Sequence, residues 1–320
     1  MKKILLINRG TDTDNFGDRA INFTLQKLLE KEGFYVDSVN YTQVFSGKGI
    51  INSLKQVISI SRTARKNYDV ALIDGGQLIQ DNKTFPLSFL LWTFFLHTFS
   101  TARIVLYSVG VDEKFGSRAL SLFRRGMRYV DRICVRDYNS QANLRMLFNR
   151  DSEVAPDCVF AISKIAQVQP KNEYNTLFGI STYRTISRYK HLDITEDEYL
   201  TQQAEIISPY LPHVKLIYNT DSDLKYARKF KDFIKDQQGI ELELIDIPNL
   251  DAYVNTIASS KSVISSRMHA LIIAKSFGKE IHPVERNRKL QTFIAEHHRE
   301  NDMEEYYHMI SQSLKRTVQD

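Results

Sequence analysis

Short apolar runs alternate with amphipathic segments along almost the whole chain. Between the runs, apolar residues recur at helical spacing, as at Ile21, Leu25, Leu28 and Leu29, and they would form one buried face of a helix. Continuous apolar strands separated by such helices are typical of a parallel sheet covered on both faces. The pattern therefore predicts an α/β protein, with strands at 4–7, 35–39, 70–73, 104–109, 133–135, 177–181, 214–218, 242–245, 263–265 and 280–282.

A polar stretch at 167–175 interrupts this alternation, which then restarts. The chain has 320 residues, and one hydrophobic core rarely serves a chain of that length. We therefore predict two Rossmann-like domains, 1–170 and 171–320, with a cleft between them. Packing of the terminal helices, from about Lys289 onward, on the first domain is an alternative to their packing on the second. Ligands of such folds bind beyond the carboxyl ends of the strands.

The most hydrophobic segment is Phe85–Phe99, which is shorter than the roughly 20 apolar residues that span a bilayer. We interpret it as a core helix. A helix that faces a membrane is the alternative, because Trp92 lies among its phenylalanines. The apolar run at 4–7 ends too early for a signal peptide, and we expect it to be the first buried strand.

Composition and charge narrow the function classes. The 43 basic and 38 acidic residues give a formal net charge of +5, which suits an anionic small substrate or a membrane-surface encounter better than nucleic-acid binding. Cys134 and Cys158 lack the spacing of a disulfide framework or a zinc site, which favours a reducing cytoplasm. No group of His, Cys, Asp and Glu has metal-ligand spacing, and we expect no metal.

Two stretches are rich in basic side chains: Arg124, Arg125, Arg128 and Arg132 in the first half, and Arg184, Arg188 and Lys190 in the second. Charge runs of this kind are usually solvated faces. The alternative is contact with an anionic membrane surface or with the pyrophosphate of a lipid-linked acceptor. That alternative predicts a peripheral protein at the inner face of the membrane.

Arg267 and His269 follow a short apolar strand and open an apolar helix. A helix N-terminus offers unpaired N–H groups and the positive end of the helix dipole, so Arg267 would add a bidentate fork where anions are already favoured. His269 would add a proton carrier that works near neutral pH. The alternative is a solvated first-turn arginine and a core histidine.

Glycine-containing loops follow the first and third predicted strands. The first loop carries Asn15, Gly17 and Asp18 at the start of a helix. Asp18 is either the N-cap or a carboxylate that handles a proton, and in the second case Gly17 would let the backbone approach a ligand. Gly75 and Gly76 form either a tight turn or a site where free N–H groups meet an anion or a sugar hydroxyl. No Gly-Lys-Ser/Thr follows them, so they are not a nucleotide-phosphate loop.

Further charged residues follow the fifth predicted strand. Arg136 is a second candidate for binding an anion through two hydrogen bonds of its guanidinium. The alternative is an internal ion pair with its neighbour Asp137. Asp157 comes after the strand-like Val154. It either places the chain in a turn or holds one of the arginines.

The order of these motifs is more specific than any one of them. NFGD, DGG, VRDxxS, PD and SRMH follow one another between residues 15 and 269. In this order the chain resembles the polysaccharide pyruvyl transferase family over about 4–293, including Lys289 before a terminal helix. Family members often carry a third glycine in the second motif, where this chain has Gln77.

The resemblance implies a glycosyltransferase-B-type fold and transfer of a pyruvyl group from phosphoenolpyruvate to a hydroxyl pair of a sugar in a surface-polysaccharide precursor, forming a ketal. Phosphoenolpyruvate carries a phosphate and a carboxylate, so two arginine forks would serve it. The implied partners are this co-substrate and a saccharide acceptor, with no further cofactor. The implied site residues are His269 and Asp18 in catalysis; Arg136, Arg267, Asp157, Ser140, Gly75 and Gly76 at the donor; and Asn15, Gly17 and Lys289 at the acceptor or in support.

Two other functions fit the same predicted fold. One is a glycosyltransferase that uses a nucleotide sugar, because a fold alone does not assign a function. A carboxylate that would bind a nucleotide base or ribose is not evident in the sequence, however. The other is a catalytically silent module that senses an anionic metabolite, and the presence of Arg136, Arg267 and His269 argues against it.

Overall fold

The computed structural model describes residues 2–8, 13–41, 49–82, 84–171, 173–190, 194–284, 288–297 and 303–319. The chain divides into two compact units, and each contains a parallel β-sheet. Unit 1 comprises Met1–Thr13, Ile21–Cys158 and Glu304–Asp320, and unit 2 comprises Asp14–Ala20 and Val159–Met303.

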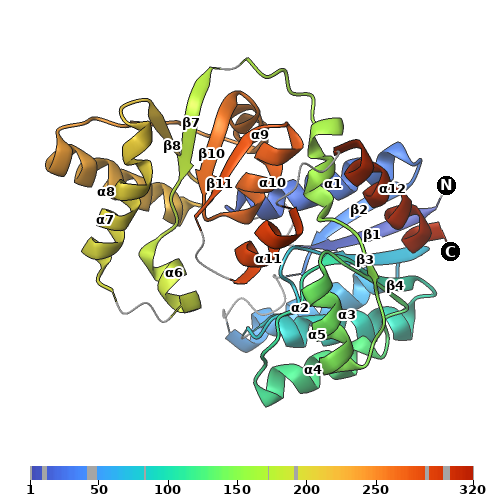
Figure 1. Ribbon diagram of the computed structural model, residues 1–320. Helices are drawn as coiled ribbons and strands as arrows, with labels where there is room; N and C mark the ends of the chain where they lie inside the picture. Colours follow the sequence, from blue (N-terminus) through green and yellow to red (C-terminus); the bar gives the residue numbers. More distant parts are fainter. Residues whose placement is uncertain are drawn as a thin grey trace. The chain divides into compact units, whose positions relative to one another are not determined.

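The strands of unit 1 are β1 (Lys3–Asn8), β2 (Tyr35–Asn40), β3 (Val70–Asp74), β4 (Arg103–Val109), β5 (Arg132–Val135) and β6 (Glu153–Val154). In the described residues they form one parallel sheet with the order β2-β1-β3-β4-β5-β6 (Figure 1). Ile4 of β1 lies opposite both Val36 and Val70. The strand order reverses between β1 and β3, and ligands of α/β sheets commonly bind beyond such a reversal.

The helices of unit 1 cover both faces of this sheet. They are α1 (Phe16–Lys31, from Ile21 onward), α2 (Gly49–Ala64), α3 (Phe85–Phe99), α4 (Ser117–Met127), α5 (Tyr138–Phe148) and α12 (Met303–Gln319). Successive residues of a strand point to opposite faces. In β4, Leu106 belongs to the core under α3, whereas the hydroxyl of Tyr107 donates to the Ile310 carbonyl of α12 over 3.0 Å. The terminal helix α12 therefore lies on the opposite face from α3.

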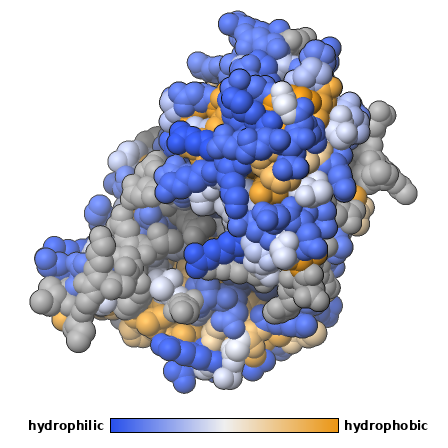
Figure 2. Space-filling view, turned by 90° about the vertical axis from the view of Figure 1, so that its left-hand side faces the viewer, coloured by the Kyte–Doolittle hydropathy of each residue, from blue (hydrophilic) through white to orange (hydrophobic). Residues whose placement is uncertain are grey.

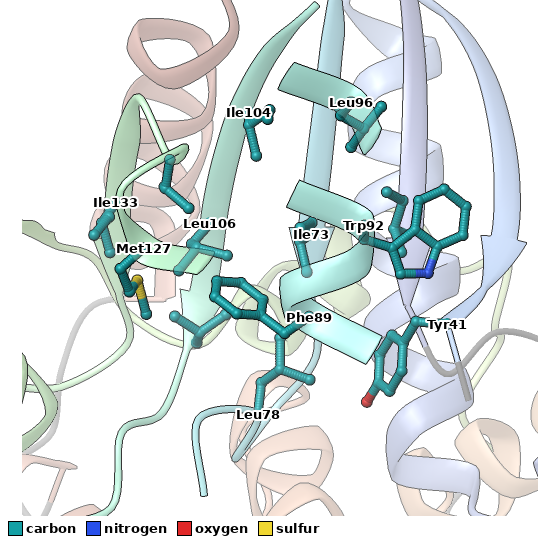
Figure 3. Close-up of a cluster of buried hydrophobic side chains, with 14 of the residues drawn as sticks. Tyr41, Ile73, Leu78, Phe89, Trp92, Leu96, Ile104, Leu106, Met127 and Ile133 are labelled. Carbon is teal, nitrogen blue, oxygen red and sulfur yellow. The ribbon is translucent and has the colours of Figure 1, made fainter. Parts of the chain in front are cut away.

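The inner side of α3 forms much of the core of unit 1. Phe89, Trp92 and Leu96 point toward the sheet residues Ile73 and Leu106 (Figure 3). Helix α4 packs closely on α3 because Gly126 has no side chain: a Cβ there would lie 2.7 Å from the Phe89 ring. The core helix predicted for 85–99 is confirmed on this side.

The outer side of α3 is not covered in the same way. Phe94 is 42% exposed and Phe99 is 39% exposed. No helix in the described part of the chain is both long enough and apolar enough to cross a membrane. Among the coloured residues on the face of the molecule seen in Figure 2, hydrophilic ones dominate, with smaller apolar patches between them.

The strands of unit 2 are β7 (Tyr174–Gly179), β8 (Val214–Ile217), β9 (Glu243–Leu244), β10 (Ser260–Ser265) and β11 (Glu280–Pro283). In the described residues they form one parallel sheet with the order β11-β10-β7-β8-β9. The helices are α6 (Tyr183–Lys190), α7 (Glu196–Ile207), α8 (Asp221–Gln238), α9 (Leu250–Ala258), α10 (Met268–Ser276) and α11 (Arg288–His297), with short 3-10 turns at Cys158–Lys164 and Ser208–Tyr210. The strand order reverses between β7 and β10, which is the Rossmann arrangement.

Both sheets agree with the predicted fold class of two Rossmann-like parts, and each predicted strand corresponds to one observed strand. The compact units differ from the predicted ranges 1–170 and 171–320 in their borders. The first turn of α1 belongs to unit 2, the chain passes from unit 1 to unit 2 after Cys158, and α12 belongs to unit 1. The place of α12, though not that of α11, matches the option that the terminal helices pack back on the first domain, because Arg103 and Tyr107 of β4 hydrogen-bond to α12.

Candidate active site

The loops after β7 and β10 meet at the strand-order reversal of unit 2 and are tied together by serines. The Ser265 hydroxyl donates to the Gly179 carbonyl over 3.1 Å and accepts from the Arg267 N–H over 3.0 Å. The hydroxyls of Ser181 and Ser266 lie 2.7 Å apart. A Cβ on Gly179 would lie 2.8 Å from Ser265 Oγ, so only glycine allows this close approach. The result is a fixed platform for the residues that open α10.

Arg267 is the N-cap residue of α10 and is held at one end of its guanidinium. Its Nη2 donates to Asp223 Oδ1 over 2.6 Å, and Asp223 is fully buried in the first turn of α8. Arg267 Nε is buried and has no hydrogen-bond partner among the described residues, and the side chain as a whole is 24% exposed. A buried donor without a partner is costly. Arg267 is thus a partly buried cation that is anchored by a buried carboxylate, and it is not the freely solvated first-turn charge of the alternative.

His269 is the second residue of α10 and packs against the first turn of α1. A Cβ on Gly17 would lie 2.5 Å from His269 Nδ1 and 3.1 Å from its Cβ, so the imidazole rests directly on the glycine backbone. Asn15 Oδ1 accepts from the Gly17 N–H over 3.0 Å, and Asn15 Nδ2 donates to Asp18 Oδ2 over 3.0 Å. Two sequence motifs about 250 residues apart therefore form one cluster within unit 2.

The N-cap alternative for Asp18 is wrong. Helix α1 begins at Phe16, and its residue Arg19 donates its backbone N–H to the Asn15 carbonyl over 3.1 Å. Asn15 therefore occupies the capping position, and its side chain accepts the second N–H of the helix. Asp18 is the third helical residue, where a carboxylate is favoured by the helix dipole.

The first turn of α1 is fixed in unit 2 by residues that the sequence analysis did not find. The Phe16 ring stacks on Tyr253 with centroids 4.8 Å apart, and the Phe16 N–H donates to the Asn219 carbonyl over 3.0 Å. Asp14 Oδ2 accepts from the Asp221 N–H over 3.0 Å. The available signal was the polar stretch that follows the predicted strand at 214–218.

Tyr253 also supports this region as a hydrogen-bond donor. Its hydroxyl donates to Asn219 Oδ1. Burial raises the pKa of Tyr253 well above its ordinary value, nearby Asp223 raises it further, and Arg267 opposes them. The phenol therefore stays protonated, which keeps the donor that orients the Asn219 amide.

Gly17→Ala is expected to lower turnover roughly ten- to hundred-fold, because the new methyl group displaces His269 from its position. Alanine itself is favourable in a helix, so the fold should persist. The measurement is kcat in the single variants and in Gly17→Ala combined with His269→Ala. If Gly17 acts through the imidazole, adding Gly17→Ala to His269→Ala causes no further loss. Full additivity of the two losses would contradict this coupling.

A second cluster lies in unit 1, beyond β3, β5 and β6, and its centre is Arg136. Arg136 is buried; its Nη2 donates to Gln77 Oε1 over 2.7 Å, and its Nη1 lies 3.5 Å from Asp157 Oδ2. Its Nε lies 3.4 Å from Asp137 Oδ2. The internal ion pair with Asp137 is therefore present, and the interpretation that Asp157 holds an arginine is confirmed.

The glycines of the second motif shape this cluster. Gly75 and Gly76 have φ values of +132° and +45°, which side-chain-bearing residues rarely adopt. Gln77 follows the two glycines directly, and its side chain is an acceptor for Arg136. A Cβ on Gly110 would lie 2.5 Å from Gln77 Oε1, so the loop after β4 also leaves room for this contact.

The remaining predicted residues have different surroundings. Ser140 is buried; its Oγ accepts from the Val111 N–H over 3.0 Å and its own N–H donates to Asp137 Oδ1 over 2.6 Å, so it anchors the loop after β4. Lys289 belongs to α11, and its side chain lies outside the described residues. A cavity of about 600 Å³ lies between the first turns of α3 and α4, and no predicted site residue lines it.

Neither cysteine is a candidate nucleophile. Cys134 and Cys158 are free and buried. Burial raises the pKa of the Cys134 thiol to about 12 and that of the Cys158 thiol well above its ordinary value. The reactive form of cysteine is the thiolate, and these thiols stay protonated. Among the described residues, no group of three or more His, Cys, Asp and Glu side chains is placed to hold a metal ion.

Comparison with known proteins gives a family match and a shared fold. The sequence model of the family described as "Polysaccharide pyruvyl transferase" matches residues 15–288. That range begins at Asn15 and contains both clusters. No curated protein matches the chain.

Several solved structures share the fold at low sequence identity. UDP-GlcNAc 2-epimerase from Methanocaldococcus jannaschii is 14% identical, with a TM-score of 0.56 over 100% of this chain and 93% of that chain. The Anabaena protein HepE, in complex with UDP and glucose, is 13% identical, with a TM-score of 0.51 over 99% and 95% of the two chains. An alpha-glucosyltransferase in complex with UDP-glucose and DNA is 11% identical, with a TM-score of 0.53 over 99% and 92%. These likenesses confirm the predicted glycosyltransferase-B-type fold.

Proposed function

The chain belongs to the polysaccharide pyruvyl transferase family, and from this premise we propose that it transfers the pyruvyl group of phosphoenolpyruvate to a hydroxyl pair of a saccharide, forming a pyruvate ketal. The observation that carries this proposal is the pairing of Arg267 and His269 at the start of α10. Arg267 supplies an anchored cation with an unused donor, and His269 supplies an imidazole two residues away.

The reaction needs one proton delivered and two removed. A proton adds to the methylene carbon of phosphoenolpyruvate, and one sugar hydroxyl adds to the neighbouring carbon as its own proton leaves. The bond between that carbon and the phosphate oxygen then breaks, and the second hydroxyl adds there with loss of its proton. One of the released protons replaces the one delivered, and the other is carried by the released hydrogen phosphate. The reaction therefore uses no oxidant and no cofactor.

We assign the donor anion to Arg267 and the N-terminus of α10. The backbone N–H groups of the first helical turn and the guanidinium both favour phosphate or carboxylate. Asp223 fixes one nitrogen of the fork, so the remaining donors are oriented before the ligand binds. His269, in the same turn, delivers or accepts the proton.

The first turn of α1 supports His269 and the acceptor. Gly17 sets the position of the imidazole, and Asn15 orients the carboxylate of Asp18. We propose that Asp18 takes a proton from a sugar hydroxyl or orients that hydroxyl. The donor-binding role of Arg136 stays a prediction, and the three side chains that already hold its guanidinium make Arg267 the stronger candidate.

Calorimetric titration with phosphoenolpyruvate tests the donor directly, because it needs no knowledge of the acceptor. We expect binding in the micromolar to millimolar range, with a clear loss of affinity in Arg267→Lys. Phosphate release that depends on an added saccharide, together with a product that carries pyruvate, then tests the transfer. Binding of a UDP-sugar without any response to phosphoenolpyruvate would instead assign a glycosyltransferase activity.

A further inference from the structure

The outer face of α2, α3 and α4 in unit 1 carries an unusual number of exposed apolar side chains. Four of the eight large apolar residues that are exposed in the described chain lie on α2 and α3: Leu54, Ile58, Phe94 and Phe99. Helix α3 also has partly exposed apolar residues, of which Leu91 and Phe95 pack against the core as well: Leu87, Leu90, Leu91 and Phe95. We call this surface the α2–α4 face.

Basic side chains flank the apolar ridge of α3. The Arg65 guanidinium, just beyond α2, lies 4.3 Å from the centre of the Phe99 ring, so α2 and α3 end beside each other. On the other flank, Phe94 contacts Tyr129, which follows α4, with ring centres 6.0 Å apart. The exposed basic residues of the two flanking helices and of the turns after them are Lys55, Arg62, Arg65 and Lys66 on one side and Arg118, Arg124, Arg125 and Arg128 on the other.

The three helices contain no acidic residue, and the exposed acidic residues nearest to them in the sequence lie beyond their ends, at Asp69, Asp81 and Asp131. The chain has 38 Asp and Glu residues, yet α2, α3 and α4 contain none. The α2–α4 face therefore combines an apolar ridge with positive charge on both sides. This combination is typical of elements that lie in the headgroup layer of an anionic bilayer, because the apolar side chains enter the acyl boundary while Lys and Arg meet the phosphates.

We propose that the α2–α4 face binds the surface of an anionic phospholipid bilayer. A second copy of this chain is a poorer occupant, because a two-fold contact would place the basic flanks against each other. No described helix is long and apolar enough to cross a membrane, so the face would lie on the bilayer. The inference rests on unit 1 alone and stands independently of the pyruvyl transfer proposed above.

Vesicle flotation with the full chain tests this proposal. The probes are phosphatidylcholine vesicles and vesicles of phosphatidylcholine mixed with phosphatidylglycerol. We expect the protein to float with the mixed vesicles and to remain at the bottom of the gradient when the vesicles contain phosphatidylcholine alone. Binding to the mixed vesicles should be weaker in high salt. Phe94→Asp is expected to abolish flotation, and Arg62→Ala or Arg125→Ala to lower the vesicle partition coefficient roughly five-fold each.

Matched controls distinguish binding through the α2–α4 face from nonspecific adsorption to vesicles. Met309→Asp changes an apolar residue that is 40% exposed on α12, on the opposite face of the sheet, and Arg228→Ala removes an exposed charge in unit 2. Both variants should float like the wild type, and circular dichroism should show that every variant is folded. Three outcomes would overturn the proposal: no flotation of the wild type, equal losses in the controls, or a dimer in light scattering that Phe94→Asp separates into monomers.

Discussion

Replacing His269 with alanine is expected to lower the kcat of ketal formation by about two to four orders of magnitude, the range found when a positioned acid or base is removed. The expectation rests on the placement of the imidazole, which packs on Gly17 in the same unit as Asn15 and Asp18. Donor binding should change little, because the anion is assigned to Arg267 and to backbone N–H groups. The measurement is kcat and KM for phosphoenolpyruvate at saturating acceptor.

His308→Ala is the matched control for this variant. His308 is exposed on α12 and hydrogen-bonds only Gln312 among the contacts that the structure gives it. It should leave kcat unchanged. His269→Gln adds a second test, because glutamine fills similar space without an imidazole proton, and it should be as slow as alanine. Wild-type turnover in both His269 variants would remove histidine from the proton-transfer role.

The strands and the SRMH motif could be predicted from sequence because their signals are local. A buried strand shows in the sequence as a short continuous run of apolar residues. The start of a helix shows as a change in the spacing of the apolar residues, to one every three or four positions. The placement of Arg267 at the start of α10 follows from residues that are neighbours in sequence. The contact of Arg267 with Asp223 could not be predicted in this way, because it joins residues 44 positions apart in the sequence, at the starts of α10 and α8.

The assignment of residues 14–20 to unit 2 was beyond sequence reasoning for the same reason. Residues 14–20 lie between two strand-like segments of the first half, so their local pattern places them in the first domain. The stacking of Phe16 on Tyr253 and its hydrogen bond to Asn219 join them to unit 2 instead. Likewise, an arginine partner for Asp157 was only one of two alternatives in the sequence, and no local pattern indicates that Gln77 accepts a hydrogen bond from the buried Arg136.

These long-range contacts change the interpretation of the site more than the strand boundaries do. A separate catalytic role for each motif would follow if NFGD and SRMH belonged to different units. Because Gly17 and His269 are in contact within one unit, a substitution in NFGD acts on the imidazole as well as on any ligand. Effects of variants in the two motifs should therefore be coupled.

Replacing Arg267 with lysine is expected to raise the KM for phosphoenolpyruvate roughly ten- to hundred-fold, which corresponds to the loss of one charged hydrogen bond. Lysine keeps the positive charge but lacks the planar guanidinium, so the Nε donor, which has no partner within the described part of the chain, is lost. Turnover at saturation should fall less than in His269→Ala. Arg145→Lys, an exposed change on α5, serves as the control.

Arg267→Ala separates binding from folding, because Asp223 would then stay buried without its cation. The free energy of unfolding should fall by up to about 3 kcal/mol. Adding Asp223→Asn removes the buried carboxylate charge that Arg267 no longer neutralises, and it should restore part of that stability. Phosphoenolpyruvate binding should stay lost in this double variant. Recovery of binding together with stability would mean that Arg267 serves the fold alone. Loss of binding in a restabilised double variant would mean that its guanidinium meets the donor anion, which is the role that the unused Nε of Arg267 indicates.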